Sequence, residues 1–125
     1  VEAGKRPRSS MAPMLVFNQQ GQLQMIAGSP GGSRIINYVA QSLVAMIDWQ
    51  MGPQQAADLA KFTHRNDLLA IEEGTPLVHL TGQLQEMGYQ VRTGELNSGL
   101  HLIKRAGAEW QAGADPRREG LAKGQ

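Results

Sequence analysis

Cysteine is absent from this 125-residue chain, so disulfide bonds and cysteine nucleophiles are excluded, and the compartment, periplasm or cytoplasm, stays open. Aromatic residues are scarce at 5%, with two Trp, two Tyr and two Phe, which are few anchors for an independent core. We therefore expect the chain to pack against another chain or segment. It also lacks an apolar run of about 18 residues, so we expect no membrane span.

An excess of charge of one sign is also missing. Lys and Arg number 12 and Asp and Glu number 11, for a net charge of +1, which argues against a nucleic-acid-binding protein. His64, His79 and His101 fall in an expected loop, helix and strand, without the spacing of metal ligands on one helix. We assign them no catalytic or metal-binding role, and we expect no cofactor.

Glycine is plentiful, with 15 residues, and three of them crowd into "IAGSPGGSRI" at residues 26–35. Glycine costs about 0.5–1 kcal/mol relative to alanine inside regular structure, so the cluster needs a reason. With Ser29 as N-cap and Pro30 as the first helical residue, Gly31 and Gly32 would direct free N–H groups outward at the positive end of a helix.

Two interpretations of this turn stay open on the residues alone. One is a plain tight turn capped by Ser29 or Ser33, and the other is a site for negative charge. The sequence lacks the P-loop and dinucleotide-binding patterns. An anion site would therefore hold a phosphate in some other way, or a transient oxyanion formed during acyl transfer.

Hydrophobic periodicity predicts an α+β fold in a single domain over residues 1–125, with a frayed tail at 115–125. The longest helix is expected over residues 30–50, with Ile36, Val39, Leu43 and Ile47 facing the core. Gly52 is expected to end it and Pro53 to begin a second helix. A third is expected to start at Thr75 and Pro76. Strands are predicted at 14–17 and 22–27, which form a β-hairpin, at 68–74 and 89–92, and at 99–104 and 109–114, which a short turn joins.

A pair of serines, Ser9 and Ser10, stands ahead of the first predicted strand in "KRPRSSM". Serines before a strand commonly fill a turn, and that is the simpler interpretation of this pair alone. Their hydroxyl groups can equally donate hydrogen bonds to a carboxylate.

The succession of "KRPRSSMAP", a short hairpin, "GSPGGSRI" and a final "GADPR" resembles the small subunit of gamma-glutamyltranspeptidases. The resemblance covers nearly the whole chain and is weakest over residues 53–100. It implies the αββα sandwich of N-terminal-nucleophile hydrolases. It also implies a precursor that cleaves itself, after which a new N-terminal threonine attacks the γ-glutamyl amide of glutathione or a related compound.

By motif match, Ser9 and Ser10 would bind the α-carboxylate of the glutamyl group, and Gly31 and Gly32 would form a backbone oxyanion hole. The family's nucleophilic threonine has no counterpart here, because the chain begins with Val1. We therefore expect a C-terminal fragment of the small subunit, inactive alone, whose partners are the upstream small-subunit segment and the large subunit. The alternatives are a related amide hydrolase or acylase, and a noncatalytic phosphate-binding module.

Overall fold

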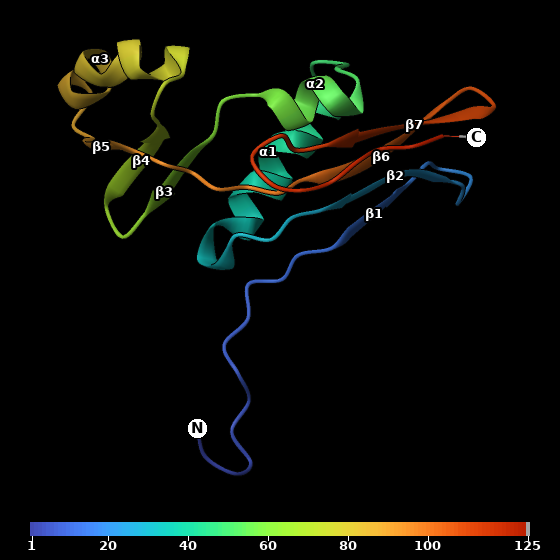
Figure 1. Cartoon of the computed structure of the whole chain (residues 1–125), viewed down its shortest axis with the longest axis horizontal. Coiled ribbons are helices and arrows are strands. Elements are labelled where there is room, and N and C mark those ends of the chain that lie inside the picture. Colours follow the sequence, from blue (N-terminus) through green and yellow to red (C-terminus); the bar gives the residue numbers. More distant parts are fainter. Residues whose placement is uncertain (125) are drawn as a thin grey trace.

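Two β-sheets and two central helices make up the body of the protein, and the computed structural model describes residues 1–124 (Figure 1). The larger sheet has the strand order β1-β2-β6-β7, and all its neighbours are antiparallel. Its strands are β1 (Met14–Phe17), β2 (Leu23–Gly28), β6 (His101–Ala106) and β7 (Glu109–Ala114). Both hairpins predicted from the sequence, β1 with β2 and β6 with β7, are confirmed.

The smaller sheet lies beyond the helices, at the other end of the molecule (Figure 1). It contains β3 (Phe62–Arg65), β4 (Leu68–Glu72) and β5 (Gln90–Gly94), with β3 antiparallel and β5 parallel to β4. A 3-10 helix (Pro76–Leu80) and α3 (Thr81–Glu86) connect the parallel pair. The sequence analysis missed β3 and placed His64 in a loop. Asn66 and Asp67, both with positive φ, form the tight turn between β3 and β4.

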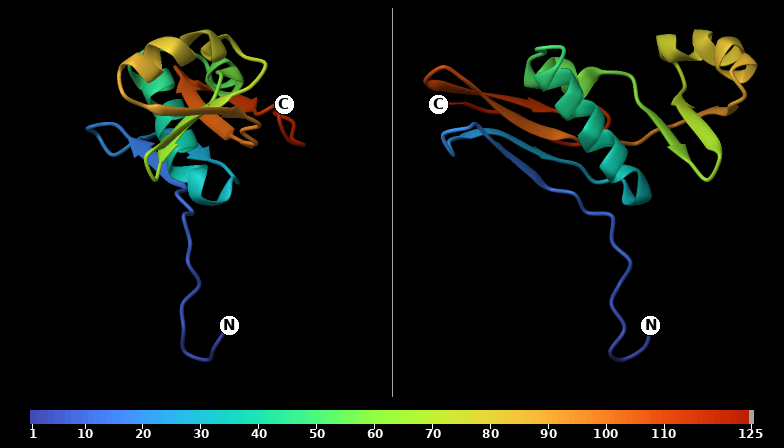
Figure 2. Two further views of the ribbon diagram at one scale, coloured as in Figure 1. Left: turned by 90° about the vertical axis from the view of Figure 1, so that its left-hand side faces the viewer. Right: turned by 180° about the vertical axis from the view of Figure 1, so that it is seen from behind.

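Helix α1 (Ile35–Ile47) crosses one face of the larger sheet, as the right-hand view of Figure 2 shows. Its buried face differs from the predicted one, because Ile36 and Ile47 are 61% and 42% exposed. Apolar residues surround much of this helix, so periodicity alone could not select the face that packs. The side chains of α1 that are buried are Ile35, Tyr38, Val39, Ser42, Ala45 and Met46.

The hydrophobic core lies between α1, the larger sheet and α2 (Pro53–Asp58). Ala45 and Met46 of α1 are fully buried, as are Leu100 ahead of β6 and Ala57 of α2. Small side chains at Ala45 and Ala57 allow the helices and the sheet to approach closely. This packing fixes the start of α1, and with it the glycine-rich turn.

Three helix boundaries differ from the sequence predictions. Ser29 and Pro30 precede the helical region, which starts with a 3-10 turn (Gly32–Arg34) and continues as α1. Gly52 does not end α1 but is the N-cap of α2, where its N–H donates to Gln55 Oε1 at 2.9 Å. The helix expected from Thr75 onward is divided into the 3-10 helix and α3.

The two ends of the described chain behave differently. Residues 1–13 form an extended arm that leads away from the body (Figures 1 and 2). The tail was predicted to be frayed from residue 115, but its first residues pack against the rest of the protein. Asp115 is 2% exposed, and Arg117 is half-buried and forms ion pairs with Glu72 and Asp115. Gln125 lies outside the described residues. Within residues 1–124, no helix has the length and apolar character needed to cross a bilayer.

Candidate active site

The glycine-rich turn between β2 and α1 needs glycine at two adjacent positions for two different reasons. Gly31 has a φ of +140°, and a Cβ placed there would lie 2.8 Å from Cε2 of Tyr38. Gly32 has a φ of +58° in the left-handed region, with open space around its missing Cβ. A side chain is therefore excluded by a clash at Gly31 and disfavoured by backbone conformation at Gly32.

The N–H groups of this turn are free to bind an external acceptor. The carbonyl of Gly31 accepts from the N–H of Arg34 at 3.2 Å, and that of Gly32 accepts from the N–H of Ile35. Within residues 1–124, the N–H groups of Gly31 and Gly32 donate to no acceptor. Two adjacent unpaired donors at the start of a helical segment suit an anion or a developing oxyanion.

Ser29 has a different role from the cap expected of it. Its hydroxyl donates to the carbonyl of Pro30 at 2.7 Å and accepts from the N–H of Gly99 at 3.2 Å. The side chain makes no capping hydrogen bond to the helical segment. Ser29 thus ties the glycine-rich turn to the residues just before β6.

The serine pair lies in the N-terminal arm. Ser9 is exposed and its Oγ accepts from the N–H of Met11 at 3.2 Å, while Ser10 is partly buried. In the part of the chain that the structure describes, no hydrogen bond joins either serine to Gly31 or Gly32. The structure therefore does not bring the two motifs into direct contact.

A buried network of charged residues, which we call the corner network, was not found from the sequence. It consists of Lys61, Glu72, Ser98, Asp115 and Arg117. Asp115 accepts hydrogen bonds from Ser98 Oγ at 2.5 Å and from Nη1 of Arg117 at 3.0 Å. The motif "GADPR" marks this corner in the sequence, because its aspartate and arginine are Asp115 and Arg117.

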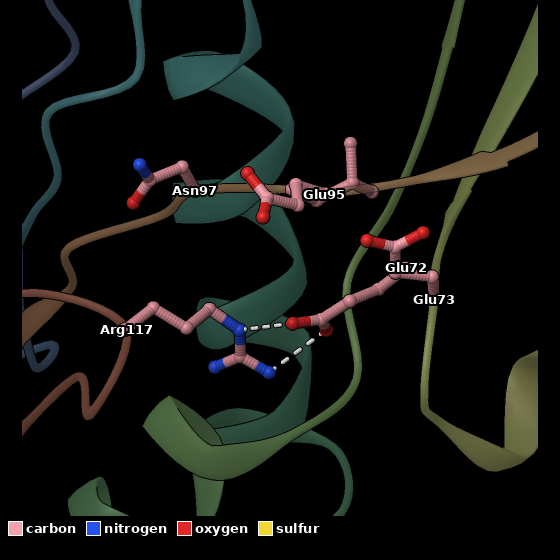
Figure 3. Close-up of a pocket in the computed structure, with 6 residues that line it drawn as sticks. Glu72, Glu73, Glu95, Asn97 and Arg117 are labelled. Atoms are coloured by element: carbon pink, nitrogen blue, oxygen red, sulfur yellow. Dashed lines mark hydrogen bonds and ion pairs between the residues drawn. The ribbon is translucent and has the colours of Figure 1, made fainter.

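Arg117 connects the end of the chain to the smaller sheet (Figure 3). Its guanidinium donates to both carboxylate oxygens of Glu72, and to the carbonyls of Ala57 and Leu59 at 3.2 and 3.1 Å. The backbone N–H of Lys61 also donates to Glu72 Oε2, at 2.7 Å. An open pocket of about 290 Å³ adjoins this pair and is lined by Glu72, Glu73, Glu95, Leu96, Asn97 and Arg117.

The ionisation of the corner network follows from burial and pairing. Burial alone would raise the pKa of Asp115, but hydrogen bonds from Ser98 and from backbone N–H groups hold that pKa below its usual value. Burial would lower the pKa of Arg117, and its bonds to Glu72 and Asp115 raise it instead. Burial, helped by the charge of Arg117, lowers the pKa of Lys61 to about 8.

The three histidines belong to three different elements, His64 to β3, His79 to the 3-10 helix and His101 to β6. His64 packs edge-on against Tyr89, with 5.8 Å between ring centroids. Nδ1 of His101 lies 3.2 Å from the carbonyl oxygen of Gly99, and His79 is exposed. Among residues 1–124, no group of three or more His, Cys, Asp or Glu side chains is arranged to hold a metal ion.

The comparison with protein families decides the assignment, because the model of the gamma-glutamyltranspeptidase family matches residues 1–125. The chain belongs to the gamma-glutamyltranspeptidase family. It is 29% identical over 126 residues to a glutathione hydrolase proenzyme of Pseudomonas aeruginosa, covering 97% of this chain. It is 34% identical over 103 residues, covering 82% of this chain, to an "Acylase ACY 1 proenzyme" of a Pseudomonas species (strain V22).

Among solved structures, the chain resembles the gamma-glutamyltranspeptidase of Pseudomonas nitroreducens in complex with L-DON. The TM-score is 0.88 at 27% identity, over the whole of this chain and 67% of that one. Such neighbours confirm the α+β class and the N-terminal-nucleophile hydrolase fold expected from the resemblance. This chain spans 22% of the length of the P. aeruginosa relative and 18% of that of the acylase.

Proposed function

We propose that this chain is part of an enzyme that transfers or hydrolyses γ-glutamyl groups of glutathione-like donors through a threonine acyl-enzyme. The observation that carries the proposal is the glycine-rich turn, where two adjacent N–H groups donate to no acceptor within residues 1–124. In the proposed reaction the threonine oxygen attacks the γ-carbonyl carbon. The carbonyl oxygen then takes up negative charge beside the N–H groups of Gly31 and Gly32.

Ser9 and Ser10 have a separate proposed role, which is to donate hydrogen bonds to the α-carboxylate of the glutamyl group. This carboxylate is charged before, during and after the reaction. Bonds to it therefore strengthen substrate binding and the transition state alike. The N–H groups of the turn act on a charge that develops only after attack, and so they lower the barrier.

The proposal places the nucleophile and the large subunit in the same precursor as this chain. Both relatives are named proenzymes and are much longer than 125 residues, which supports the idea of a longer precursor. We propose that the 125-residue chain alone has no transferase or hydrolase activity. Acyl transfer of this kind needs a nucleophile with a general base beside it, and Val1 supplies no nucleophilic side chain.

A second candidate function is favoured by the acylase relative. An acylase built on the same fold would use the same oxyanion donors but accept an acyl group other than glutamyl. The proposed role of Ser9 and Ser10 separates the two, since it requires an acyl group that carries a carboxylate. A phosphate bound at Gly31 and Gly32 without catalysis is the third possibility.

The decisive experiment expresses the complete protein that contains this chain and follows self-cleavage by mass spectrometry. The processed enzyme is then offered γ-glutamyl-p-nitroanilide and a matched anilide whose acyl group has the same length but no α-carboxylate. We expect cleavage of the γ-glutamyl compound and not of its analogue. Cleavage of both at equal rates would favour the acylase, and cleavage of neither by processed protein would contradict the proposed enzyme.

A further inference from the structure

A pocket of about 240 Å³ lies next to the glycine-rich turn and shares no lining residue with the corner network. It is formed between the 3-10 turn that precedes α1 and the β3–β4 hairpin, and is lined by Arg34, Thr63, Arg65, Asn66, Leu68 and Ala70. Two hydrogen bonds join α1 to β3 and to the residues just before it. Asn37 Nδ2 donates to the carbonyl of Phe62 at 2.7 Å, and Gln41 Nε2 donates to that of Ala60 at 2.8 Å.

The pocket carries positive charge without an acidic partner. Within residues 1–124, neither Arg34 nor Arg65 forms a salt bridge, and this includes Asp67, the carboxylate nearest to them along the hairpin. The Arg65 guanidinium donates instead to Ser33 Oγ, which orients it toward the 3-10 turn. Two such guanidinium groups offer several planar donors to one anion.

Thr63 adds a neutral donor to the same pocket. Its side chain lines the pocket, although the residue as a whole is only 5% exposed. Its hydroxyl can therefore donate a hydrogen bond to an acceptor in the pocket, beside the two guanidinium groups. A hydroxyl and two guanidinium groups together suit a carboxylate.

The position of the pocket relative to the turn indicates which carboxylate it could bind. Arg34 follows Gly32 by two residues, and Ser33, which contacts Arg65, follows it directly. An extended residue spans about 3.3–3.6 Å, so the terminal carboxylate of a dipeptide lies roughly 7 Å from its nitrogen. An amide cleaved at the glycine-rich turn could thus extend a peptide leaving group toward the pocket.

We propose that Arg34 and Arg65, assisted by Thr63, bind the carboxylate of the amino acid or peptide on the amine side of the scissile bond. The same pocket would hold the leaving group during cleavage and the acceptor during transfer. This rests on the proposed γ-glutamyl chemistry and adds a second carboxylate site to it. Ser9 and Ser10 serve the acyl side of the substrate, and the two arginines serve the amine side.

The test compares substrates that differ in the charge of the amine side. Processed wild-type enzyme and the variants Arg34→Gln and Arg65→Gln are assayed with glutathione, whose leaving dipeptide carries a carboxylate, and with γ-glutamyl-p-nitroanilide, whose leaving group carries none. Hydrogen bonds to a charged group are worth about 1.5–3 kcal/mol, which corresponds to a factor of roughly 10–150. We expect the ratio of kcat/KM for glutathione to kcat/KM for the anilide to fall by about that factor in each variant.

Acceptors provide an independent arm of the same experiment. Transfer to glycylglycine should require a higher acceptor concentration in both variants, whereas transfer to glycylglycinamide should show no such change relative to wild type. Arg92→Gln is the matched control, because Arg92 is exposed on β5 and forms no salt bridge within residues 1–124. The control should keep the wild-type ratio and the wild-type acceptor dependence.

Two results would overturn this pocket while leaving the proposed function standing. One is an unchanged ratio of kcat/KM for glutathione to kcat/KM for the anilide in both arginine variants. The other is an equal loss of kcat/KM for glutathione and for the anilide in a folded, processed Arg65→Gln enzyme. Arg65 is the sharper position of the two, because it lies on the hairpin and not in the turn itself. A processed wild-type enzyme that cleaves no γ-glutamyl compound would overturn the proposed function, and this proposal with it.

Discussion

The corner network and the glycine-rich turn treat polar groups in opposite ways. In the corner network, Asp115 and Arg117 are surrounded by partners and help to join the end of the chain to α2 and β4. At the turn, two N–H groups find no acceptor within residues 1–124, and the neighbouring Arg34 finds no carboxylate. Polar groups that are fully paired hold the fold, whereas unpaired donors are available to a substrate.

The largest predicted effect on this comparison comes from removing one partner of a buried ion pair. Arg117→Met should lower the free energy of unfolding by about 3–5 kcal/mol, because it leaves Glu72 and Asp115 without their shared cation. Urea unfolding of the complete protein measures the change. Arg92→Met, at an exposed and unpaired position on β5, is the control and should change stability by about 0.5 kcal/mol or less. Equal effects of the two substitutions would show that the network does not stabilise the fold.

A change in the glycine-rich turn should lower the catalytic rate and leave the stability of the protein unchanged. A backbone ester that replaces the N–H of Gly32 removes one proposed oxyanion donor, and losing one such donor typically lowers kcat by roughly 10²–10³. KM should stay nearly unchanged, since the charge exists only after attack. Proline is unsuitable for this test, because Gly32 has a φ of +58° and proline requires a φ near −65°.

Self-cleavage of the ester variant must be checked by mass spectrometry before kcat is measured, because a processing defect would imitate a catalytic one. The equivalent ester at an exposed strand position, Thr93, is a suitable control. Full kcat in processed enzyme carrying the Gly32 ester would show that the glycines serve only the tight turn.

The serine pair is expected to give a smaller effect of a different kind. Ser9→Ala and Ser10→Ala should each lower kcat/KM for γ-glutamyl donors by about 10- to 150-fold, mainly through KM, because each removes a hydrogen bond to a charged group. Steady-state kinetics with γ-glutamyl-p-nitroanilide measures both constants. Unchanged KM values in both variants would contradict the assignment of the α-carboxylate to these serines.

The sequence predicted the features that depend on neighbouring residues and missed those that depend on residues far apart in the chain. The glycine-rich turn, the two hairpins and the α+β class all follow from neighbouring residues, and the structure confirms the hairpins and the class. The buried face of α1 did not follow, because apolar residues such as Ile36 and Ile47 also occupy its exposed side. The corner network was beyond reach for another reason. Arg117 and Glu72 are 45 residues apart, and no local pattern indicates that they meet.

At the start of α1, the predicted free N–H groups are present although the predicted local geometry is wrong. The sequence analysis placed Gly31 and Gly32 inside the first helical turn, but both have positive φ and precede α1. Within residues 1–124 their N–H groups still donate to no acceptor, because both residues lie before the first hydrogen bond of the helix. The left-handed backbone at Gly32 could have been suspected from the doubled glycine alone.

Lys61 gives the smallest of the predicted effects, and it differs from Asp115 and Arg117 within the corner network. The residue is 1% exposed and its Nζ donates to the carbonyl of Ala57 at 2.9 Å, yet within residues 1–124 it forms no salt bridge with a carboxylate. The charges that act on it are Arg117, Asp115, Glu72 and Asp58, and burial outweighs them in lowering its pKa to about 8. Folding therefore disfavours the charged form of Lys61.

The pH dependence of stability follows from that depressed pKa. Between about pH 8 and the usual lysine pKa near 10.5, the unfolded chain keeps the Lys61 proton and the folded chain has released it, so stability rises with pH. In Lys61→Met this contribution is absent. The free energy of unfolding of wild type relative to Lys61→Met, measured in urea, should thus increase by roughly 1–2 kcal/mol between about pH 7.5 and 9.5. Burial raises the pKa of Tyr38 above its ordinary value of 10.0, so that group titrates above this window. A difference between the two proteins that stays constant with pH would mean that Lys61 keeps its proton in the folded state, paired as firmly as Arg117.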